Sequence, residues 1–246
     1  MSDTQGHVGG SIERTLAGDA ELEILPVLRE AWARTEGIKA IMVGGLLLIY
    51  AAIVAATWVL GQVFGVEDET MIGSTVTQLV LMMIVYPFFA GVFMLGLRRS
   101  AGLPVRFEDQ FSFYRELMPI VAVGALQSLV TFLGFMLLIV PGIYLTFALC
   151  LAVPLKAERN LPITDCLIMS ARLVNRKFFE VTVLTLASVA LAVLGIVSLI
   201  GWIWTMPWTL MILAIIYRQL AGFTPAAGTG AAGGPESGGD SGTVEF

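Results

Sequence analysis

The sequence predicts an all-α fold: a polytopic membrane helical bundle of six transmembrane helices, with amphipathic helices along the inner leaflet. Of the 246 residues, 57% are hydrophobic and 13% are charged, whereas a typical soluble domain is about 25% charged. Four long uncharged runs are each long enough to cross a bilayer. All 14 Lys and Arg residues lie outside these runs. Together these observations exclude an ordinary soluble globule and indicate a membrane protein.

The longest uncharged run, 117–155, is too long for one crossing. As a single helix at ~1.5 Å per residue it would measure roughly 58 Å, about twice the ~30 Å core of a bilayer. Pro141 has no N–H to donate, and Gly142 accepts a positive φ. We therefore expect a transmembrane hairpin that turns at Pro141 and Gly142, with Arg115 and Lys156 at its inner ends.

The remaining uncharged runs supply four more crossings. Runs 40–66 and 70–97 are each suited to one crossing, and the acidic cluster 67–69 between them marks an outer turn. Run 181–217 is again too long for one helix, and Gly201 divides it. With the central hairpin, the sequence therefore predicts six crossings.

The distribution of basic residues predicts the orientation. In the six-crossing arrangement, all 14 Lys and Arg residues fall on one side and none is left for the three outer turns. The positive-inside rule assigns that side to the cytoplasm. We therefore expect a multi-pass protein of the bacterial cytoplasmic (inner) membrane with both termini cytoplasmic. No removable signal peptide is expected, so the first crossing would remain as an anchor.

Each pair of crossings is preceded by a short segment with helical amphipathic periodicity. These segments are 21–36, 105–116 and 163–178. Their apolar faces are suited to the headgroup boundary of the inner leaflet. The sequence therefore predicts three interfacial helices and a weak internal repeat of helix plus hairpin.

The third interfacial segment carries the candidate contacts to lipid headgroups. Arg172, Arg176 and Lys177 border its apolar face, and each cation near an anionic membrane surface contributes about 1 kcal/mol of attraction. The bilayer, with its anionic phospholipids, is therefore an expected partner. The positive-inside bias alone would also place these cations on the inner side. The pattern therefore leaves open whether they bind lipid headgroups or only set the topology.

Both ends of the chain have the composition of disordered tails. Residues 1–20 are polar and aperiodic, and residues 221–246 are rich in Gly, Ala, Pro and Ser. The transmembrane domain is therefore expected at 21–220. The two cysteines, Cys150 and Cys166, are too few for a disulfide framework and are expected to be reduced thiols.

The sequence carries no pattern typical of an enzyme. The one histidine, His7, lies in the N-terminal tail, and no run carries a carboxylate or a nucleophile motif. No cluster has metal-ligand spacing, since the consecutive acids 67–69 are more typical of a solvated loop. We therefore predict no catalytic residue, no cofactor, no metal and no nucleic-acid partner.

One polar patch lies within the central hairpin. Gln127, Ser128 and Thr131 are the most polar cluster of any run. An interhelical hydrogen bond of ~1 kcal/mol explains such residues, and a substrate contact is the alternative. Prolines within four crossings leave a carrier with broken helices open as well; these are Pro87, Pro141, Pro154 and Pro207.

The stretch from Leu138 to Leu145 (LIVPGIYL), followed by Val153-Pro154, Glu158 and Ser170 to Leu173, resembles a bacterial membrane protein group. This group includes the YciC-like family and the membrane domain joined to some glycerophosphodiester phosphodiesterases. The resemblance covers roughly 21–220. It implies a six-span integral membrane protein of unassigned role, and it implies no catalytic residues.

From these observations we predict a structural, interaction or envelope-related protein of the cytoplasmic membrane. The alternative is an uncoupled permease or a lipid-handling protein, because the runs contain no ionisable group of the kind that ion-coupled transport uses. Small-residue pairs such as Ser188 and Ala192 favour helix packing within one chain. A homo-oligomer or a membrane-protein partner is the other use of such pairs.

Overall fold

The computed structural model describes residues 8–19, 21–64, 71–197 and 201–224. Within them the chain is helical throughout, with one isolated β-bridge, so the predicted all-α class is confirmed. The helices are α1 (Ile12–Ala17), α2 (Ile24–Thr35), α3 (Lys39–Phe64), α4 (Met71–Ser100), the 3₁₀ helix η1 (Phe107–Glu116), α5 (Leu117–Leu137), α6 (Ile139–Ala148), α7 (Ala152–Arg159), α8 (Ile163–Arg176), α9 (Phe178–Val197) and α10 (Trp202–Ala221).

Five helical segments in the described part of the chain are long and apolar enough to cross a membrane, so the chain is a multi-pass membrane protein by length and composition. The helix α10, expected as the sixth crossing, is not among them. The five candidate spans are Lys39–Val63, Gly73–Ser100, Phe107–Leu137, Ile139–Arg159 and Phe178–Gly195.

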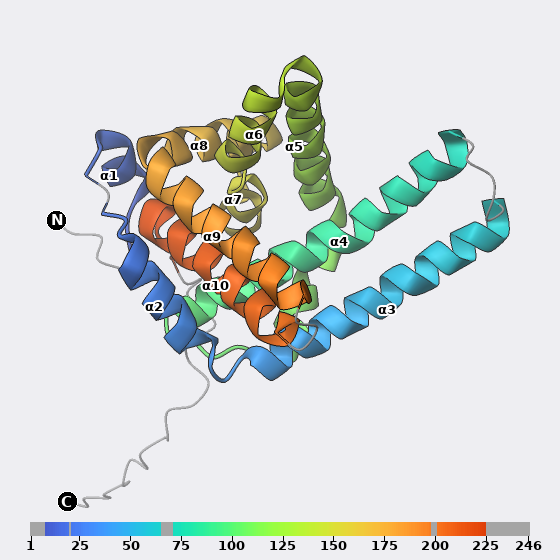
Figure 1. Ribbon diagram of the computed structural model, residues 1–246, viewed down its shortest axis with the longest axis horizontal. Helices are drawn as coiled ribbons and strands as arrows, with labels where there is room; N and C mark the ends of the chain where they lie inside the picture. Colours follow the sequence, from blue (N-terminus) through green and yellow to red (C-terminus); the bar gives the residue numbers. More distant parts are fainter. Residues whose placement is uncertain (1–7, 20, 65–70, 198–200, 225–246) are drawn as a thin grey trace, which may run out of the picture.

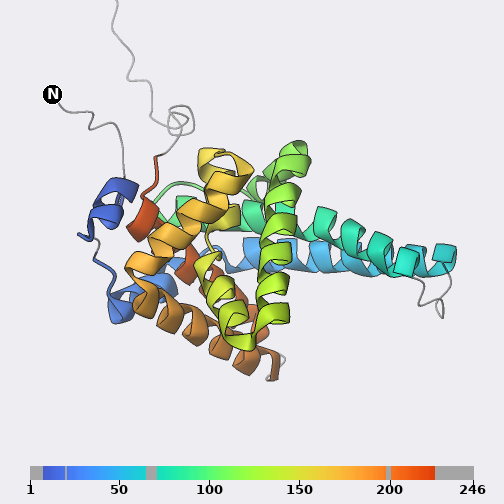
Figure 2. The same ribbon diagram turned by 90° about the horizontal axis from the view of Figure 1, so that it is seen from above.

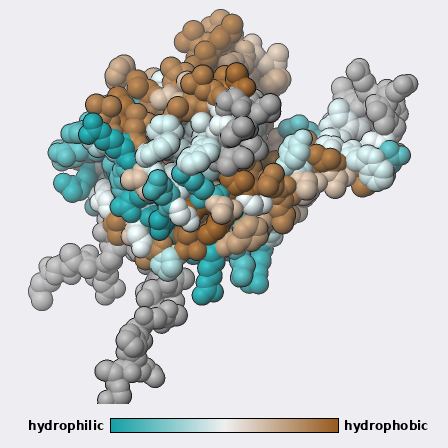
Figure 3. Space-filling model, turned by 60° about the horizontal axis from the view of Figure 1, so that its bottom comes forward, coloured by the Kyte–Doolittle hydropathy of each residue, from teal (hydrophilic) through white to brown (hydrophobic). Residues whose placement is uncertain are grey.

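The long helices form diverging pairs around a common body. Helices α3 and α4 run side by side and project away from the body, while α5 and α6 form a second hairpin in another direction (Figures 1 and 2). In the body, α10 packs against α2 and α4, and α4 also packs against α7. In Figure 3 hydrophilic residues gather on part of the body, and apolar surface covers much of the remaining face. Large exposed apolar side chains on α3, α5, α6 and α9 are expected where a helix faces lipid.

The central hairpin is present, but its reversal lies earlier than the sequence predicted. The chain turns at Leu138, which has an extended backbone between α5 and α6. Pro141 lies in the first turn of α6, where a missing N–H breaks no helical hydrogen bond. Gly142 does not have a positive φ. A Cβ at Gly142 would lie 2.4 Å from the Phe135 ring, so this glycine permits close contact between the two arms.

Helix α8 supports a break in the second arm of this hairpin. Between α6 and α7 the backbone leaves the helical pattern at residues 149–151. The buried Ser170 hydroxyl accepts a hydrogen bond from the Leu151 N–H (3.1 Å) and donates one to the Ala148 carbonyl (2.8 Å). These bonds satisfy backbone groups that the break would otherwise leave unpaired inside the protein.

The N-terminal segment covers the end of α10, which corrects the predicted disordered tail. Residues 8–19 pack against α10 and include the helix α1, while residues 1–7, 20 and 225–246 lie outside the described part of the chain. A Cβ at Gly10 would lie 1.9 Å from the Gln219 carbonyl oxygen, so only glycine allows this approach. Donors from elsewhere bond the last α10 carbonyls: Gly10 N–H to Arg218 (3.0 Å), Thr15 Oγ1 to Leu220 (2.6 Å) and Arg159 Nη2 to Ala221 (2.6 Å).

The two ends of the described chain meet. Val8 and Phe223 form an antiparallel bridge with N–H···O distances of 2.9 and 3.0 Å. The first and last described segments of the chain therefore lie side by side.

The contact between Lys39 and Trp204 does not fit an arrangement in which the chain crosses the membrane six times. The sequence placed Lys39 on the inner side and Gly201, three residues before Trp204, on the outer side. In the structure the Lys39 Nζ lies 3.8 Å from the centre of the Trp204 ring. A cation on one face of a ~30 Å core does not reach a ring near the other face. This contact agrees with the exclusion of α10 from the candidate spans.

Candidate intramembrane cavity

A cavity of about 550 Å³ lies where α4, α5, α6, α7, α9 and α10 come together. Its volume is within the ~300–1,000 Å³ of small-molecule sites. Most of its lining is apolar. The lining residues are Val85, Tyr86, Phe89, Gln127, Thr146, Cys150, Val153, Thr185, Ser188, Val189, Ala192, Thr209, Leu210, Ile212, Leu213 and Ile216.

Small side chains on α9 leave space for the cavity. Thr185, Ser188, Val189 and Ala192 follow at helical spacing and form one face of this helix. The sequence identified Ser188 and Ala192 as a small pair for close helix packing. In the structure this pair lines the cavity instead.

The rim of the cavity is open to the surroundings of the helices. Val85 on α4 is 41% exposed and Val189 on α9 is 52% exposed, and both belong to the lining. Both residues lie within candidate membrane spans. The opening is therefore bordered by side chains that face hydrocarbon when these spans cross a bilayer.

The polar patch predicted in the central hairpin is divided by the structure. Gln127 lines the cavity, whereas Thr131 does not. Ser128 shares a 2.6 Å hydrogen bond with the Tyr86 hydroxyl and so joins α5 to α4. Tyr86 packs directly over Gly124, where a Cβ would lie 2.4 Å from the ring. Ser128 thus makes an interhelical bond, and Gln127 is the member that a ligand would meet.

Two lining side chains carry buried oxygen atoms that make no hydrogen bond. In the described part of the chain, neither Gln127 Oε1 nor Thr185 Oγ1 has a hydrogen-bond partner. An unpaired buried polar atom costs about 1–3 kcal/mol. Sequence reasoning found Gln127 and missed Thr185, because threonine is common in apolar helices and only the fold brings α9 and α5 to the same cavity.

The lining contains no Asp, Glu, Lys, Arg or His. A charged ligand would enter this apolar space without a counter-ion, which is strongly unfavourable. Within the described residues, no group of three or more His, Cys, Asp or Glu is placed to hold a metal ion. The cavity therefore suits an uncharged, mainly apolar molecule.

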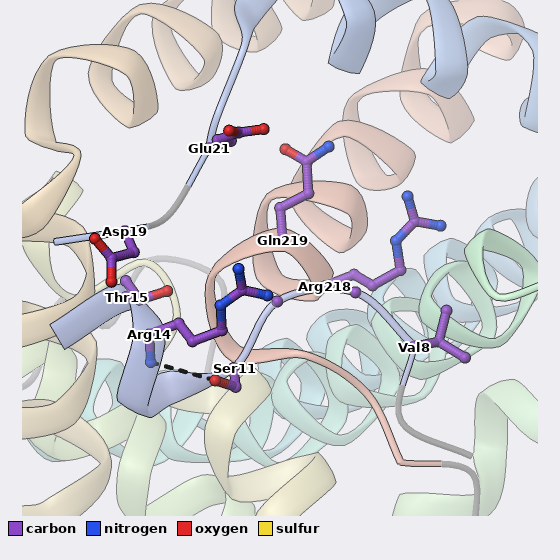
Figure 4. A pocket seen from close by; sticks show the side chains of 10 residues that line it. Val8, Ser11, Arg14, Thr15, Asp19, Glu21, Arg218 and Gln219 are labelled. Atoms are coloured by element: carbon purple, nitrogen blue, oxygen red, sulfur yellow. Dashed lines mark hydrogen bonds between the residues drawn. The ribbon is translucent and has the colours of Figure 1, made fainter. Parts of the chain in front are cut away.

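A second cavity of about 540 Å³ lies between the N-terminal segment and the end of α10. Figure 4 shows Arg14, Asp19 and Glu21 around this space, with Gln219 contributed by α10. Cations and carboxylates occur together in its lining, so their charges favour no single ligand class. Arg218 also lines this space, and its guanidinium pairs with Glu30 in the contact described next.

Arg218 is the centre of an ion-pair network in the body. It is 8% exposed, and its Nη2 lies 2.8 Å from Glu30 of α2. Its Nη1 donates to the carbonyl of Ser100 at the end of α4. Glu30 also pairs with Arg34 at 2.7 Å. Removing one member of a buried pair leaves an uncompensated charge, so this network holds α2, α4 and α10 together.

The predicted headgroup residues lie at the end of α8. Arg172 and Arg176 are exposed, and Lys177 is half-buried with its Nζ 3.9 Å from Glu180. Val174 is buried and Asn175 is exposed. The Tyr144 hydroxyl donates to the Asn175 Oδ1 at 2.9 Å. The end of α8 is thereby joined to α6, away from the Arg218 network.

Comparison with protein-family models, with curated proteins and with solved structures gives no match. The candidate site therefore rests on the residues and geometry of this chain.

Proposed function

We propose that this protein is a lipid-handling protein of the bacterial cytoplasmic membrane that holds the apolar chain of a membrane molecule in the α4–α10 cavity. The single observation that carries the proposal is the apolar cavity of about 550 Å³ with a rim in candidate membrane spans. A molecule dissolved in the bilayer enters such a rim without crossing water. The resemblance to the YciC-like group agrees with an integral membrane protein of this kind.

The cavity favours lipid handling over a purely structural role. Protein interiors are close-packed, and a void lined by apolar side chains costs stability in proportion to its volume. A protein that only packs helices gains nothing from an open space at Ala192. An occupant of the cavity offsets this cost.

The lining also favours lipid handling over transport of polar solutes. A carrier for polar molecules needs polar groups along a path, and proton- or ion-coupled transport needs ionisable groups in the membrane. The lining offers no charged residue. We infer a non-enzymatic protein whose ligand comes from the bilayer.

We further propose that both termini lie in the cytoplasm and that Arg172 and Arg176 contact anionic headgroups. The bridge between Val8 and Phe223 supports a common side for the ends. The exposure of both arginines supports a headgroup contact. The positive-inside rule supports the cytoplasmic assignment.

Filling the cavity tests the proposed function. Ala192→Trp places a large ring in the lining, whereas Ala190→Trp places the same ring on an exposed position of α9. Lipids that remain with each protein after extraction in mild detergent are measured by mass spectrometry. We expect the wild type and Ala190→Trp to retain the same lipids and Ala192→Trp to lose them several-fold. Equal retention in all three proteins, each monodisperse by size exclusion, would overturn the proposal.

A further inference from the structure

We propose that the molecule in the cavity carries a neutral hydrogen-bond donor, such as an alcohol or a protonated carboxylic acid, held by Gln127 and Thr185. This inference rests on the proposed function and adds the chemical class of the ligand head. Its starting point is the two buried atoms, Gln127 Oε1 and Thr185 Oγ1, that have no partner among the described residues.

Other polar side chains of the lining already use their hydrogen-bonding groups locally. The Tyr86 hydroxyl is bonded to Ser128, and three hydroxyls donate to carbonyls one turn earlier in their own helices. Gln127 and Thr185 are therefore the side chains of the described lining that carry a buried oxygen without any hydrogen bond. The three hydroxyls are those of Thr146, Ser188 and Thr209.

The polarity of these groups defines what they recognise. The Gln127 Oε1 is an acceptor, so it needs an O–H or N–H from the ligand, whereas the Thr185 hydroxyl both donates and accepts. A hydroxyl or a protonated carboxyl group matches both. A plain hydrocarbon matches neither, and it leaves both atoms unpaired in an apolar space.

The absence of charge in the lining excludes an ionised head at this position. A phosphate needs Lys, Arg or helix N-termini around it, and the described lining contains no Lys or Arg. The apolar residues on α10, Leu210, Leu213 and Ile216, instead offer a surface for an alkyl chain. The ligand class is therefore a neutral single-chain amphiphile dissolved in the bilayer.

Competition with a photoreactive alkyl probe tests this inference. The purified protein in detergent is labelled by a diazirine-bearing alkane, and hexadecanol, hexadecane and hexadecyl phosphate compete for the label. We expect hexadecanol to compete about fivefold better than hexadecane, as one or two hydrogen bonds would give, and hexadecyl phosphate to compete least.

Three substitutions test whether the preference for hexadecanol depends on Gln127 and Thr185. Gln127→Leu and Thr185→Val should each reduce the roughly fivefold advantage of hexadecanol over hexadecane to about one. Thr131→Val, in the same polar patch but outside the lining, should keep the full preference. Circular dichroism establishes that each variant is folded.

The possible outcomes separate this inference from the proposed function. Equal competition by hexadecanol and hexadecane in the wild type, or a preference for hexadecyl phosphate, would overturn the neutral-donor inference and leave the cavity as an alkyl-chain site. Preference for hexadecanol that survives in both cavity variants would also overturn it. Labelling that no compound reduces and that Ala192→Trp does not lower would overturn the proposed function itself.

Discussion

At the residue scale, the stability of the central hairpin depends on one hydroxyl. Ser170 is fully buried and bonds both sides of the break between α6 and α7. These two groups are the Leu151 N–H and the Ala148 carbonyl. The break deprives both of the helical partners that they would have in a regular helix. A single side chain from α8 thus allows an irregular backbone inside the protein.

Ser170→Ala removes both hydrogen bonds and leaves a buried N–H and a buried carbonyl unpaired. We expect a loss of about 1–3 kcal/mol of stability, measured by thermal unfolding in detergent. Ser188→Ala is the matched control, because its hydroxyl only bonds the carbonyl one turn back in its own helix. Unfolding temperatures that are equal for Ser170→Ala and the wild type would contradict this role.

The thiol of Cys166 provides a test of burial at the same scale. Burial raises the pKa of this thiol, an effect that the nearby Lys156 partly opposes. A raised pKa means less thiolate at pH 8, so alkylation should be slower than for an unfolded cysteine and should accelerate only at higher pH. The rate is measured against pH in a Cys150→Ala protein, with the unfolded chain as reference. The same dependence of the alkylation rate on pH in the native and the unfolded protein would contradict the raised pKa of Cys166.

Of the two cavity residues with unpaired oxygens, the sequence alone pointed to Gln127 and not to Thr185. Gln127 was identifiable because an amide is unusual within an uncharged run. Thr185 carried no such signal, since helices accommodate threonine by bonding its hydroxyl to their own carbonyls. Only the packing of α9 against α6 and α10 makes Thr185 part of a site.

At the element scale, the hairpin was predicted correctly and its turn was not. The length of the uncharged run and the flanking cations required a reversal, and one is present between α5 and α6. Proline is as well suited to the first turn of a helix as to a loop, so Pro141 marked the start of α6 instead of the turn. Gly142 is needed for contact between the arms.

This difference predicts unequal effects of two substitutions. Gly142→Leu introduces a side chain where a Cβ alone would lie 2.4 Å from the Phe135 ring, so we expect low abundance of the protein in membranes. Pro141→Leu should be tolerated, because leucine is a good helix former. Immunoblots of membrane fractions measure both. A stronger effect of Pro141→Leu than of Gly142→Leu would show that the turn at Leu138 depends on proline.

At the scale of the whole molecule, composition and charge predicted a helical multi-pass membrane protein but not the arrangement of the helices. The N-terminal segment was read as a tail because it is polar and short of apolar residues. It is ordered because Gly9 and Gly10 let the backbone lie directly on the end of α10. Such pairing joins residues about 210 positions apart in the chain, and it leaves no local pattern.

The meeting of the two ends makes the sidedness of the protein testable. A reporter that works only outside the cytoplasm should be inactive when fused before Val8 and also when fused after Thr224. The same reporter inserted at 67–69 should be active, because that acidic turn is expected outside. Activity at one end alone would contradict the common side proposed for the two ends from the bridge between Val8 and Phe223.

The central claim is that a membrane molecule occupies the cavity bordered by α4, α5, α9 and α10. The most direct test is to reconstitute the protein in vesicles that contain a long-chain alcohol with a diazirine in its alkyl chain, irradiate, and map the labelled residues of α9 by mass spectrometry. The account predicts strong labelling of the cavity face, at Val189 and Ala192, that falls when an unlabelled occupant is added in excess. Labelling of Ala192 that is no stronger than labelling of Val193 and Leu194 on the exposed face of α9, or that an excess of competitor does not reduce, would contradict it.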